Sequence, residues 1–139
     1  MCQKNNKSHE VRMIVPFHDV DSMQIVWHGN YMKYFDITRF SLFKKADIDL
    51  YELYKESQYI LPITRSSVKY IIPLCHNDEF ICKACVLQAK AKIVMDFEIR
   101  LVKNGKLSTK GSSEQVAVKM PEKEIMFEIP KEISKPLGF

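Results

Sequence analysis

Hydrophobic positions recur along the chain with two different spacings, and each spacing predicts a different kind of element. Residues 9–17, HEVRMIVPF, alternate between polar and apolar side chains, which is typical of a strand with one buried face. Pro16 indicates the end of this strand or an edge position, because proline cannot donate a hydrogen bond to a neighbouring strand. Residues 1–8 are polar, and we expect them to be disordered.

From Gly29 onward the apolar positions recur at steps of three and four residues, which predicts a long amphipathic helix. Asn30 is a candidate N-cap, and Lys44 and Lys45 stand near the C-terminal end, where the helix dipole favours cations. The apolar stripe is rich in aromatic residues, so we expect the helix to be buried against a sheet. The members of the stripe are Tyr31, Tyr34, Phe35, Ile37, Thr38, Leu42 and Ala46.

The chain after this helix predicts one more short helix and then only strands. The short helix is expected over residues 47–57, with Asp47 or Asp49 as its cap. The Asn104–Gly105 pair between two alternating segments indicates a hairpin. The tail, residues 124–139, predicts a short edge strand or a helical turn. The strands are expected at residues 59–74, 78–94, 95–104 and 106–120.

This order of elements predicts an α+β fold, in which a curved five-stranded antiparallel sheet wraps a long central helix. With 139 residues, the chain is long enough for one domain with a substantial core and too short for two, so we expect one domain over residues 1–139. The helix covers only one face of the sheet. Because the other face and the edges still need burial or charge, a dimer that extends the sheet is a natural expectation.

Charge and hydropathy exclude several classes of protein. The formal net charge of +4 is mild, and nucleic-acid binders usually carry a denser basic stripe. No segment approaches the roughly 20 apolar residues that span a membrane. The N-terminal residues lack the apolar stretch of a signal peptide, so we expect a cytoplasmic protein.

The cysteines raise the question of a zinc site, since Cys75 and His76 precede the pair Cys82 and Cys85. The segment that contains CKAC is apolar, β-branched and free of turn residues, which indicates a strand. Positions three apart in a strand point to opposite faces, whereas zinc ligands must converge. We therefore predict no metal site and no cofactor, and a metal-binding protein stays the alternative that metal analysis would test.

Two carboxylates, Asp19 and Asp21, stand shortly before the predicted helix start at residues 28–31. The first N–H groups of a helix lack internal partners and carry the positive end of its dipole, so they can polarise a carbonyl oxygen. A nearby carboxylate can attack the carbonyl carbon or deprotonate a water that does. A thioester suits such a site, because its thiolate leaves without much help from an acid. The structural alternative is a capped turn, of which Asp-x-Asp is also typical.

Residues 19–39, DVDSMQIVWHGNYMKYFDITR, resemble the signature of the 4-hydroxybenzoyl-CoA thioesterase-like (YbgC/FadM-like) acyl-CoA thioesterases. Residues 68–84, VKYIIPLCHNDEFICKA, resemble a second segment of the same family, and the likeness extends over about residues 10–120. The resemblance implies the hotdog fold. It also implies an enzyme, a thioester hydrolase that converts an acyl-CoA to a carboxylic acid and free CoA.

The resemblance further implies roles for individual residues. Asp21 matches the catalytic carboxylate of the family and would act as nucleophile or general base, while Asp19 would shape the loop. The backbone N–H of His28, helped by that of Gly29, would polarise the thioester carbonyl, and the His28 side chain would orient water or substrate. We expect the catalytic residues to be Asp21 and His28. The expected substrate-binding residues are Gln24, Gly29, Asn30, Tyr31 and Lys69.

Gln24 and the pair Asp36 and Arg39 are two further features of this segment. The family commonly has glycine where this chain has Gln24, so a positive φ there would strain the turn or change its path. Gln24 could instead face the substrate, and it keeps open a non-catalytic acyl-CoA-binding module. Asp36 and Arg39 lie one helical step apart, and we expect them to form an ion pair with a structural role.

The expected partners follow from the same resemblance. Family members place the active site at a dimer interface, and their dimers commonly pair into tetramers, so we expect a homodimer or homotetramer. The substrate would be an acyl-CoA, and an acyl carrier protein thioester is the alternative, because both ligands carry phosphate and a basic surface suits them. Basic side chains that could meet the phosphates are Arg65, Lys69, Lys90 and Lys92.

Overall fold

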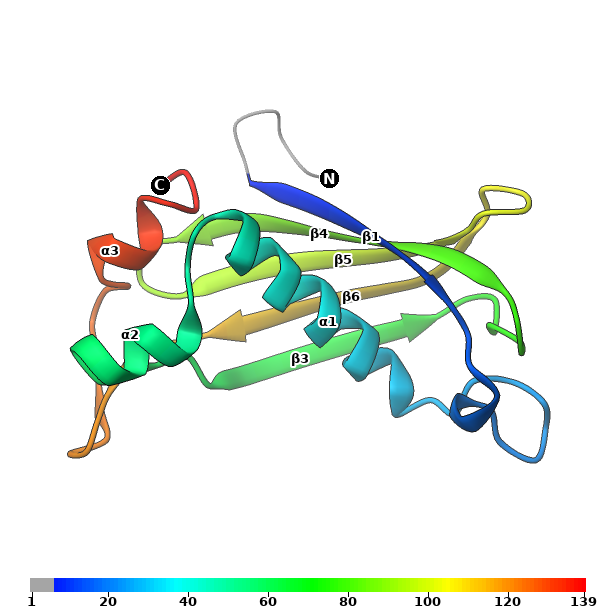
Figure 1. Ribbon diagram of the computed structural model, residues 1–139, viewed down its shortest axis with the longest axis horizontal. Helices are drawn as coiled ribbons and strands as arrows, with labels where there is room; N and C mark the ends of the chain where they lie inside the picture. The colour runs from blue at the N-terminus through cyan, green and yellow to red at the C-terminus, as the bar shows by residue number, and fades with distance from the viewer. Residues whose placement is uncertain (1–6) are drawn as a thin grey trace.

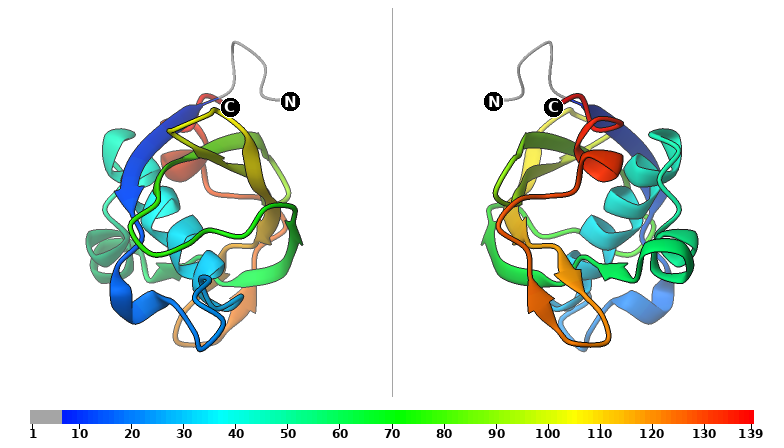
Figure 2. Two further views of the ribbon diagram at one scale, coloured as in Figure 1. Left: turned by 90° about the vertical axis from the view of Figure 1, so that its right-hand side faces the viewer. Right: turned by 90° about the vertical axis from the view of Figure 1, so that its left-hand side faces the viewer.

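The computed structural model describes residues 7–139 and places one long helix, α1 (Asn30–Lys45), against the inner face of a curved sheet (Figure 1). The five strands of this sheet are antiparallel and lie in the order β1-β4-β5-β6-β3. Viewed along its length, the sheet curls around α1 (Figure 2). The strands are β1 (Ser8–Ile14), β3 (Ile63–Tyr70), β4 (Glu79–Ala89), β5 (Ile93–Leu101) and β6 (Leu107–Gln115).

The shorter elements gather mainly near the C-terminal end of α1, while the loop over residues 17–29 lies at its N-terminal end (Figure 1). Three two-residue strands form a second antiparallel sheet in the order β2-β7-β8. The shorter elements are the 3-10 helix η1 (Phe17–Asp19), α2 (Leu50–Ser57), β2 (Tyr59–Ile60), β7 (Val118–Lys119), β8 (Glu124–Ile125) and α3 (Lys131–Ser134).

The predicted α+β hotdog architecture is confirmed, but several strand boundaries differ from the prediction. The segments predicted as single strands at residues 59–74 and 106–120 each divide between the large sheet and the small one. The turn between β4 and β5 falls at residues 90–92 rather than at 94–95. The prediction missed its position because this Lys-Ala-Lys turn contains neither glycine nor proline. The hairpin at Asn104–Gly105 is confirmed, with Gly105 at a φ of 70°. The tail forms both predicted alternatives, a short strand and a helical turn.

The aromatic stripe of α1 faces the sheet and forms the centre of the core. Phe35 stacks on Phe97 of β5 with ring centroids 4.6 Å apart. Gly111 of β6 leaves room for this arrangement, because a Cβ atom there would lie 2.4 Å from the Phe35 ring. The placement of Ile37 in the stripe was wrong: its side chain is 42% exposed. At about 100° per residue, position 37 turns to the opposite side of the helix from Phe35.

The helix caps differ in part from the prediction. Gly29, not Asn30, is the N-cap of α1, and Asn30 is the first helical residue. The Asn30 side chain instead donates to the Asp19 carbonyl oxygen at 2.9 Å. Asp49 caps α2, as one of the two predicted choices. Of the segment expected to be disordered, residues 1–6 lie outside the described residues, and Ser8 begins β1.

The two cysteines of the CKAC segment lie on opposite faces of β4, as predicted. Cys82 is buried in the core, where burial raises the pKa of its thiol to about 12. Cys85 lies on the outer side of the sheet, in a cavity that Lys83 and Lys110 also line. Within residues 7–139, no group of three or more His, Cys, Asp or Glu side chains could hold a metal ion. In the same range, we find no helix whose length and apolar character would let it cross a membrane.

Candidate active site

The loop between β1 and α1 is fixed by backbone hydrogen bonds to itself and to the segment that precedes β4. The Val26 N–H donates to the Leu74 carbonyl at 2.8 Å, and Ile25 forms a bridge with Cys75. Within the loop, the Asp21 N–H donates to the Ile25 carbonyl at 2.9 Å and closes a tight turn. The turn therefore has a defined path, and Asp21 stands at its start.

Asp19 ties the loop to α1. Its side chain is buried, and its two carboxylate oxygens accept hydrogen bonds from Lys33 Nζ at 2.5 Å and from Tyr34 Oη at 2.7 Å. Burial by itself would raise the pKa of Asp19, but the hydrogen bonds from Lys33 and Tyr34 outweigh it and lower that pKa below its ordinary value. Its backbone carbonyl also accepts from the Trp27 N–H at 3.0 Å. Asp19 is thus a fully satisfied structural carboxylate, in agreement with the role expected for it.

Asp21 has a different environment, since its side chain lines a small cavity of about 190 Å³. One carboxylate oxygen accepts a hydrogen bond from the Met23 N–H at 2.8 Å, which orients the group. No side chain among the described residues pairs with this carboxylate, so it is available to a bound molecule. The residues that line the cavity are Asp21, Met23, Ile25, Val26, His28, Tyr31, Tyr70, Ile71 and Pro73.

The N-terminal end of α1 adjoins this cavity. His28 contributes its side chain to the wall, and the Tyr70 hydroxyl donates to the His28 carbonyl at 3.0 Å, which holds β3 against the start of the helix. None of the hydrogen bonds within residues 7–139 uses the N–H of His28 or Gly29. Gly29 also accommodates the Trp27 indole, because a Cβ atom at this position would lie 2.2 Å from the ring.

Tyr31 forms the inner wall of the cavity and belongs to the core as well. Its hydroxyl accepts a hydrogen bond from the Leu74 N–H at 3.1 Å, and its ring packs edge-on against those of Tyr34 and Tyr70. Burial raises the pKa of the Tyr31 phenol, so it stays protonated at neutral pH. It is a fixed apolar wall with one polar atom, rather than an acid or base that titrates near neutrality.

The turn contains a strained residue, since Gln24 has a φ of 69°. A left-handed conformation costs a residue with a Cβ atom about 1–2 kcal/mol, and glycine avoids that cost. Gln24 is exposed and is not among the residues that line the Asp21 cavity. The departure from the glycine common in the resembling family therefore leaves the turn formed but strained.

We expect Gln24→Gly to raise the free energy of unfolding by about 0.5–1 kcal/mol. The relief of strain exceeds the ~0.5–1 kcal/mol that glycine loses through its greater freedom in the unfolded chain. Urea unfolding of the wild type and of Gln24→Gly measures the difference. Gln24→Ala is the matched control, because it keeps the Cβ atom and the strain. An equal gain in both variants would contradict the explanation.

Not every residue predicted for the site lies in this cavity. Asp21, His28 and Tyr31 line it together, whereas Asn30 is bound to Asp19. Lys69 lines the separate cavity on the outer face of the sheet. Of the other basic residues proposed for phosphate binding, Lys92 forms an ion pair with Glu114.

Sequence reasoning did not single out Tyr70, Ile71 and Pro73 as part of the site, although all three line the Asp21 cavity. Tyr70 ends β3 and the other two residues follow it, more than 40 residues after Asp21 in the sequence. The available signal was the Tyr and Pro of the segment YIIP, which the family resemblance had already included. The sequence also did not identify Lys33 and Tyr34 as the hydrogen-bond partners of Asp19.

The geometry combines a carboxylate, a helix N-terminus and a small apolar wall, which together suit addition to a polarised carbonyl. A carbonyl oxygen near the free N–H groups of His28 and Gly29 would gain from the helix dipole as negative charge develops. The cavity thus supports acyl-transfer chemistry.

Solved structures with the same fold include two CoA thioesterases and a protein solved in complex with CoA. A 1,4-dihydroxy-2-naphthoyl-CoA thioesterase from Synechocystis is 17% identical, with a TM-score of 0.86, and the match covers 94% of this chain and 95% of that one. The 4-hydroxybenzoyl CoA thioesterase from Pseudomonas sp. strain CBS-3 is 17% identical, with a TM-score of 0.83 and coverage of 94% and 99%. The protein SAV2348 from Staphylococcus aureus, solved in complex with CoA, is 14% identical, with a TM-score of 0.84 and coverage of 94% and 82%.

At these identities the solved structures show the fold. A comparison with curated protein sequences found no match. A family model described as the thioesterase-like superfamily matches residues 15–137, nearly the whole chain, and includes the loop, α1 and the large sheet after β1. The chain therefore belongs to the thioesterase-like superfamily.

Proposed function

We propose that this protein hydrolyses acyl-CoA thioesters to a carboxylic acid and free CoA. The observation that carries the proposal is the position of Asp21, whose carboxylate pairs with no side chain of residues 7–139 and shares a cavity with the N-terminal end of α1. The two carboxylates of the loop have different roles in this proposal. Asp19 is buried and bound to α1, which leaves Asp21 as the one available for chemistry.

In the proposed mechanism, the N–H groups of His28 and Gly29 hold the thioester oxygen as it becomes negative. Asp21 either attacks the carbonyl carbon to form an acyl anhydride, which water then hydrolyses, or removes a proton from the attacking water. In both cases the carbon–sulfur bond breaks, and the CoA sulfur leaves as a thiolate that water protonates. The His28 side chain, which lines the same cavity, orients the water or the substrate.

Two features support CoA as the carrier of the acyl group. A protein of the same fold was solved with CoA bound, and this chain has a formal net charge of +4, which suits a ligand with phosphate groups. We expect Arg65 and Lys69 of β3 to meet those phosphates. An acyl carrier protein thioester is the second candidate, because the same charge suits its acidic surface.

The proposal includes a homodimer formed through β3. Every residue of this edge strand except Val68 is exposed, whereas burial along β1, at the other edge, alternates. An exposed strand edge offers unpaired backbone groups to a partner strand. Exposed apolar side chains of Ile37, Phe40 and Ile63 lie on α1 and β3, and a second copy would cover them.

We expect Ile63→Lys to shift the protein from dimer toward monomer, because the substitution places a charge in the proposed interface. Sedimentation measurements over a range of protein concentrations would show at least ~10-fold weaker association, since burying an unpaired charge costs more than 1.4 kcal/mol. Ile14→Lys at the β1 edge, where the side chain is 58% exposed, is the matched control and should leave the dimer intact. The opposite result would place the interface at β1.

The experiment that tests the function is free-thiol release from a panel of acyl-CoAs, short to long and including benzoyl-CoA, beside the same acyl groups on an acyl carrier protein. Turnover of at least one acyl-CoA supports the proposal, and the panel identifies the acyl class. Turnover of carrier-protein thioesters alone would assign the second candidate. Binding of acyl-CoA by folded protein without release would instead indicate an acyl-CoA-binding module.

A further inference from the structure

Two segments project beyond β3 at the same edge of the molecule (Figures 1 and 2). One is the loop over residues 17–29, named the Asp21 loop below, which lies beside the Tyr70 end of β3. The other is the β7–β8 hairpin, which lies near the Ile63 end, because β2 directly precedes that end and pairs with β7. The exposed edge strand β3 therefore runs between two projections.

The hairpin is anchored to the body of the protein. β7 pairs with β2, and the Met120 N–H donates to the Gln58 carbonyl at 2.8 Å. Lys119 Nζ donates to the Ser57 carbonyl at 2.6 Å and lies 4.7 Å from the centroid of the Tyr59 ring. These contacts fix the direction in which the hairpin projects, so it presents a defined surface.

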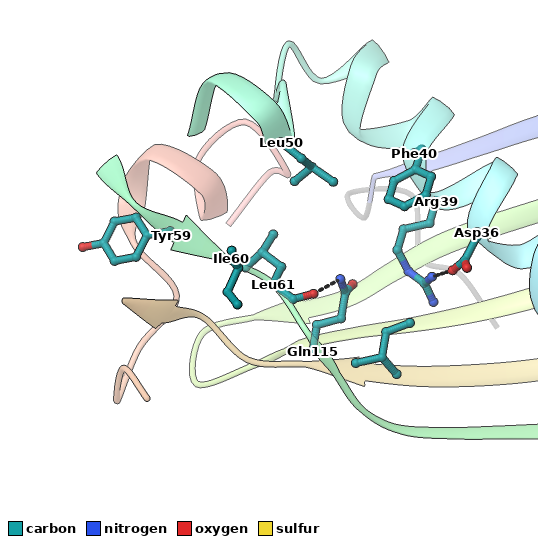
Figure 3. A pocket seen from close by; sticks show the side chains of 9 residues that line it. Asp36, Arg39, Phe40, Leu50, Tyr59, Ile60, Leu61 and Gln115 are labelled. Carbon is teal, nitrogen blue, oxygen red and sulfur yellow. Dashed lines mark hydrogen bonds and ion pairs between the residues drawn. The ribbon is translucent and has the colours of Figure 1, made fainter. Parts of the chain in front are cut away.

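Apolar side chains cross the small sheet in one row. Val118 pairs with Ile60 on one side and with Ile125 on the other, and directly opposite side chains share a face of a sheet. Ile60 lines a cavity of about 310 Å³ between α1, β2, the start of β3 and the end of β6 (Figure 3). Ile125 is 66% exposed, and Phe127 is 97% exposed. The hairpin thus carries apolar surface from this cavity outward to the edge of the molecule.

The walls of this cavity are firmly held. Arg39 forms an ion pair with Asp36, as the sequence predicted, and donates from Nη2 to Ser113 Oγ at 2.8 Å. Gln115 donates from Nε2 to the Leu61 carbonyl at 2.9 Å (Figure 3). These bonds join α1 to β6, and β6 to the segment that follows β2. The apolar row of the small sheet therefore rests on a rigid base.

The Asp21 loop has an exposed apolar surface of its own, beside the candidate catalytic carboxylate. Met23 is 69% exposed and Trp27 is 51% exposed. The Met23 N–H is also the group that orients the Asp21 carboxylate, at 2.8 Å, and Met23 lines the Asp21 cavity. The next residue, Gln24, has the strained φ of 69°. A contact that fixes Met23 would therefore fix the orientation of Asp21 as well.

A two-fold axis through β3 would bring these two surfaces together. In a symmetric antiparallel pair of β3 strands, the Ile63 end of each strand lies beside the Tyr70 end of the other. The hairpin of one copy would then face the Asp21 loop of its partner. The eight residues of β3 cover a strip only about 26 Å long and roughly 10 Å wide, whereas a stable dimer buries about 800 Å² per partner. The hairpin and the loop supply apolar area at both ends of this strip.

We infer that the β7–β8 hairpin of one protomer packs against the Asp21 loop of its partner, with Ile125 against Met23. Phe127 and Trp27 extend the contact. This inference rests on the proposed thioesterase activity and on the β3 dimer. Ile125 is a positioning residue, because it holds Met23 in place and the Met23 N–H holds the Asp21 carboxylate. Each active site is then complete only when the second copy is present.

Photo-crosslinking tests the contact directly. p-Benzoylphenylalanine at position 125, which reacts with nearby C–H bonds on illumination, should join two chains, and the linked peptide should contain Met23 or Trp27. A mixture of heavy-isotope-labelled and unlabelled chains shows whether the link joins different chains. The same residue at position 102, in the β5–β6 hairpin, is the control and should give no link to the Asp21 loop. No link, a link within one chain, or a link to another segment would overturn the inference.

Kinetic measurements test whether the contact orients Asp21. Ile125→Ser should reduce kcat for acyl-CoA hydrolysis by ~10-fold or more and change KM little, because a small displacement of a catalytic group costs much of its effect. Ile125→Leu keeps the apolar contact and should keep kcat within about twofold of wild type. Val102→Ser, at an exposed apolar residue of the β5–β6 hairpin, is the matched control and should leave kcat unchanged.

All three variants are compared at protein concentrations at which sedimentation shows a dimer. An unchanged kcat in dimeric Ile125→Ser would overturn the inference, and so would a wild-type protein that stays monomeric at every concentration.

The emission of Trp27, the only tryptophan of the chain, reports on the loop without any substrate. Dimer formation should bury Trp27 and shift its emission to shorter wavelengths, and Ile125→Ser should lose most of this shift. If no acyl-CoA is hydrolysed but the shift and the crosslink are found, the proposed activity fails and the contact stands. If acyl-CoAs are hydrolysed and neither the shift nor the crosslink is found, the proposed activity stands and the inference is wrong.

Discussion

Asp21→Ala should reduce kcat for thioester hydrolysis by ~10²-fold or more while it changes the free energy of unfolding little. The Asp21 side chain makes one hydrogen bond, to the Met23 N–H, and no described side chain pairs with it. Its loss therefore removes little from the fold. If Asp21 is the nucleophile or the general base, however, the substitution removes the group that starts the reaction.

Asp21→Asn refines this test, because the amide oxygen still accepts the hydrogen bond from Met23 but the side chain can no longer act as a base. We expect kcat to fall substantially here too, with KM less affected, because the amide keeps the shape of the cavity wall. Asp78→Asn is the matched control: its carboxylate also accepts a loop N–H, that of Cys75, outside the Asp21 cavity. Equal kcat values for Asp21→Ala and wild type would assign the loop a structural role only.

Asp19→Asn should lower the free energy of unfolding by about 2 kcal/mol at neutral pH, the largest effect on stability that we expect from a change in the loop. The substitution removes the charge that binds Lys33 Nζ and weakens the acceptor of the Tyr34 hydroxyl. Glu98→Gln, which breaks an exposed ion pair with Arg100, is the control and should stay within about 0.5 kcal/mol of wild type.

The stability difference between wild type and Asp19→Asn should also depend on pH. Because the pKa of Asp19 is lower in the folded protein than the ordinary value of 3.8, its contribution is fully present above that value. It is lost as the pH falls through the folded pKa. Urea unfolding at pH 7 and at several values below 4 would show the difference shrinking with acid, whereas a constant difference would mean that the Asp19 charge contributes nothing.

The sequence predicted the fold well where the signal is local. The three- and four-residue spacing of aromatic side chains placed α1 correctly, and the family resemblance and enzyme class are confirmed by the superfamily match. The division of residues 59–74 between two sheets was not predictable in this way. Both parts contain β-branched residues, and which sheet each joins depends on the partner strands β6 and β7.

The same distinction applies to the site. Asp21, His28 and Tyr31 lie within eleven consecutive residues, so a short motif could bring them together. Which of Asp19 and Asp21 is buried depends on Lys33 and Tyr34, one or two turns into the helix, and on how the helix packs. Tyr70 reaches the cavity only because β3 runs beside the start of α1.

The sequence by itself determined the class of fold, the family, the loop that contains the candidate carboxylates and the pairing of Asp36 with Arg39. These depend on periodicity and on contacts between residues close in the chain. The tertiary structure decided which carboxylate is left without a side-chain partner among residues 7–139 and which residues complete its cavity. It also decided that, in the same range, Arg39 Nε and Gln115 Oε1 are buried without a hydrogen-bond partner. Those outcomes depend on burial, and burial is set by the packing of strands and helix that lie far apart in the sequence.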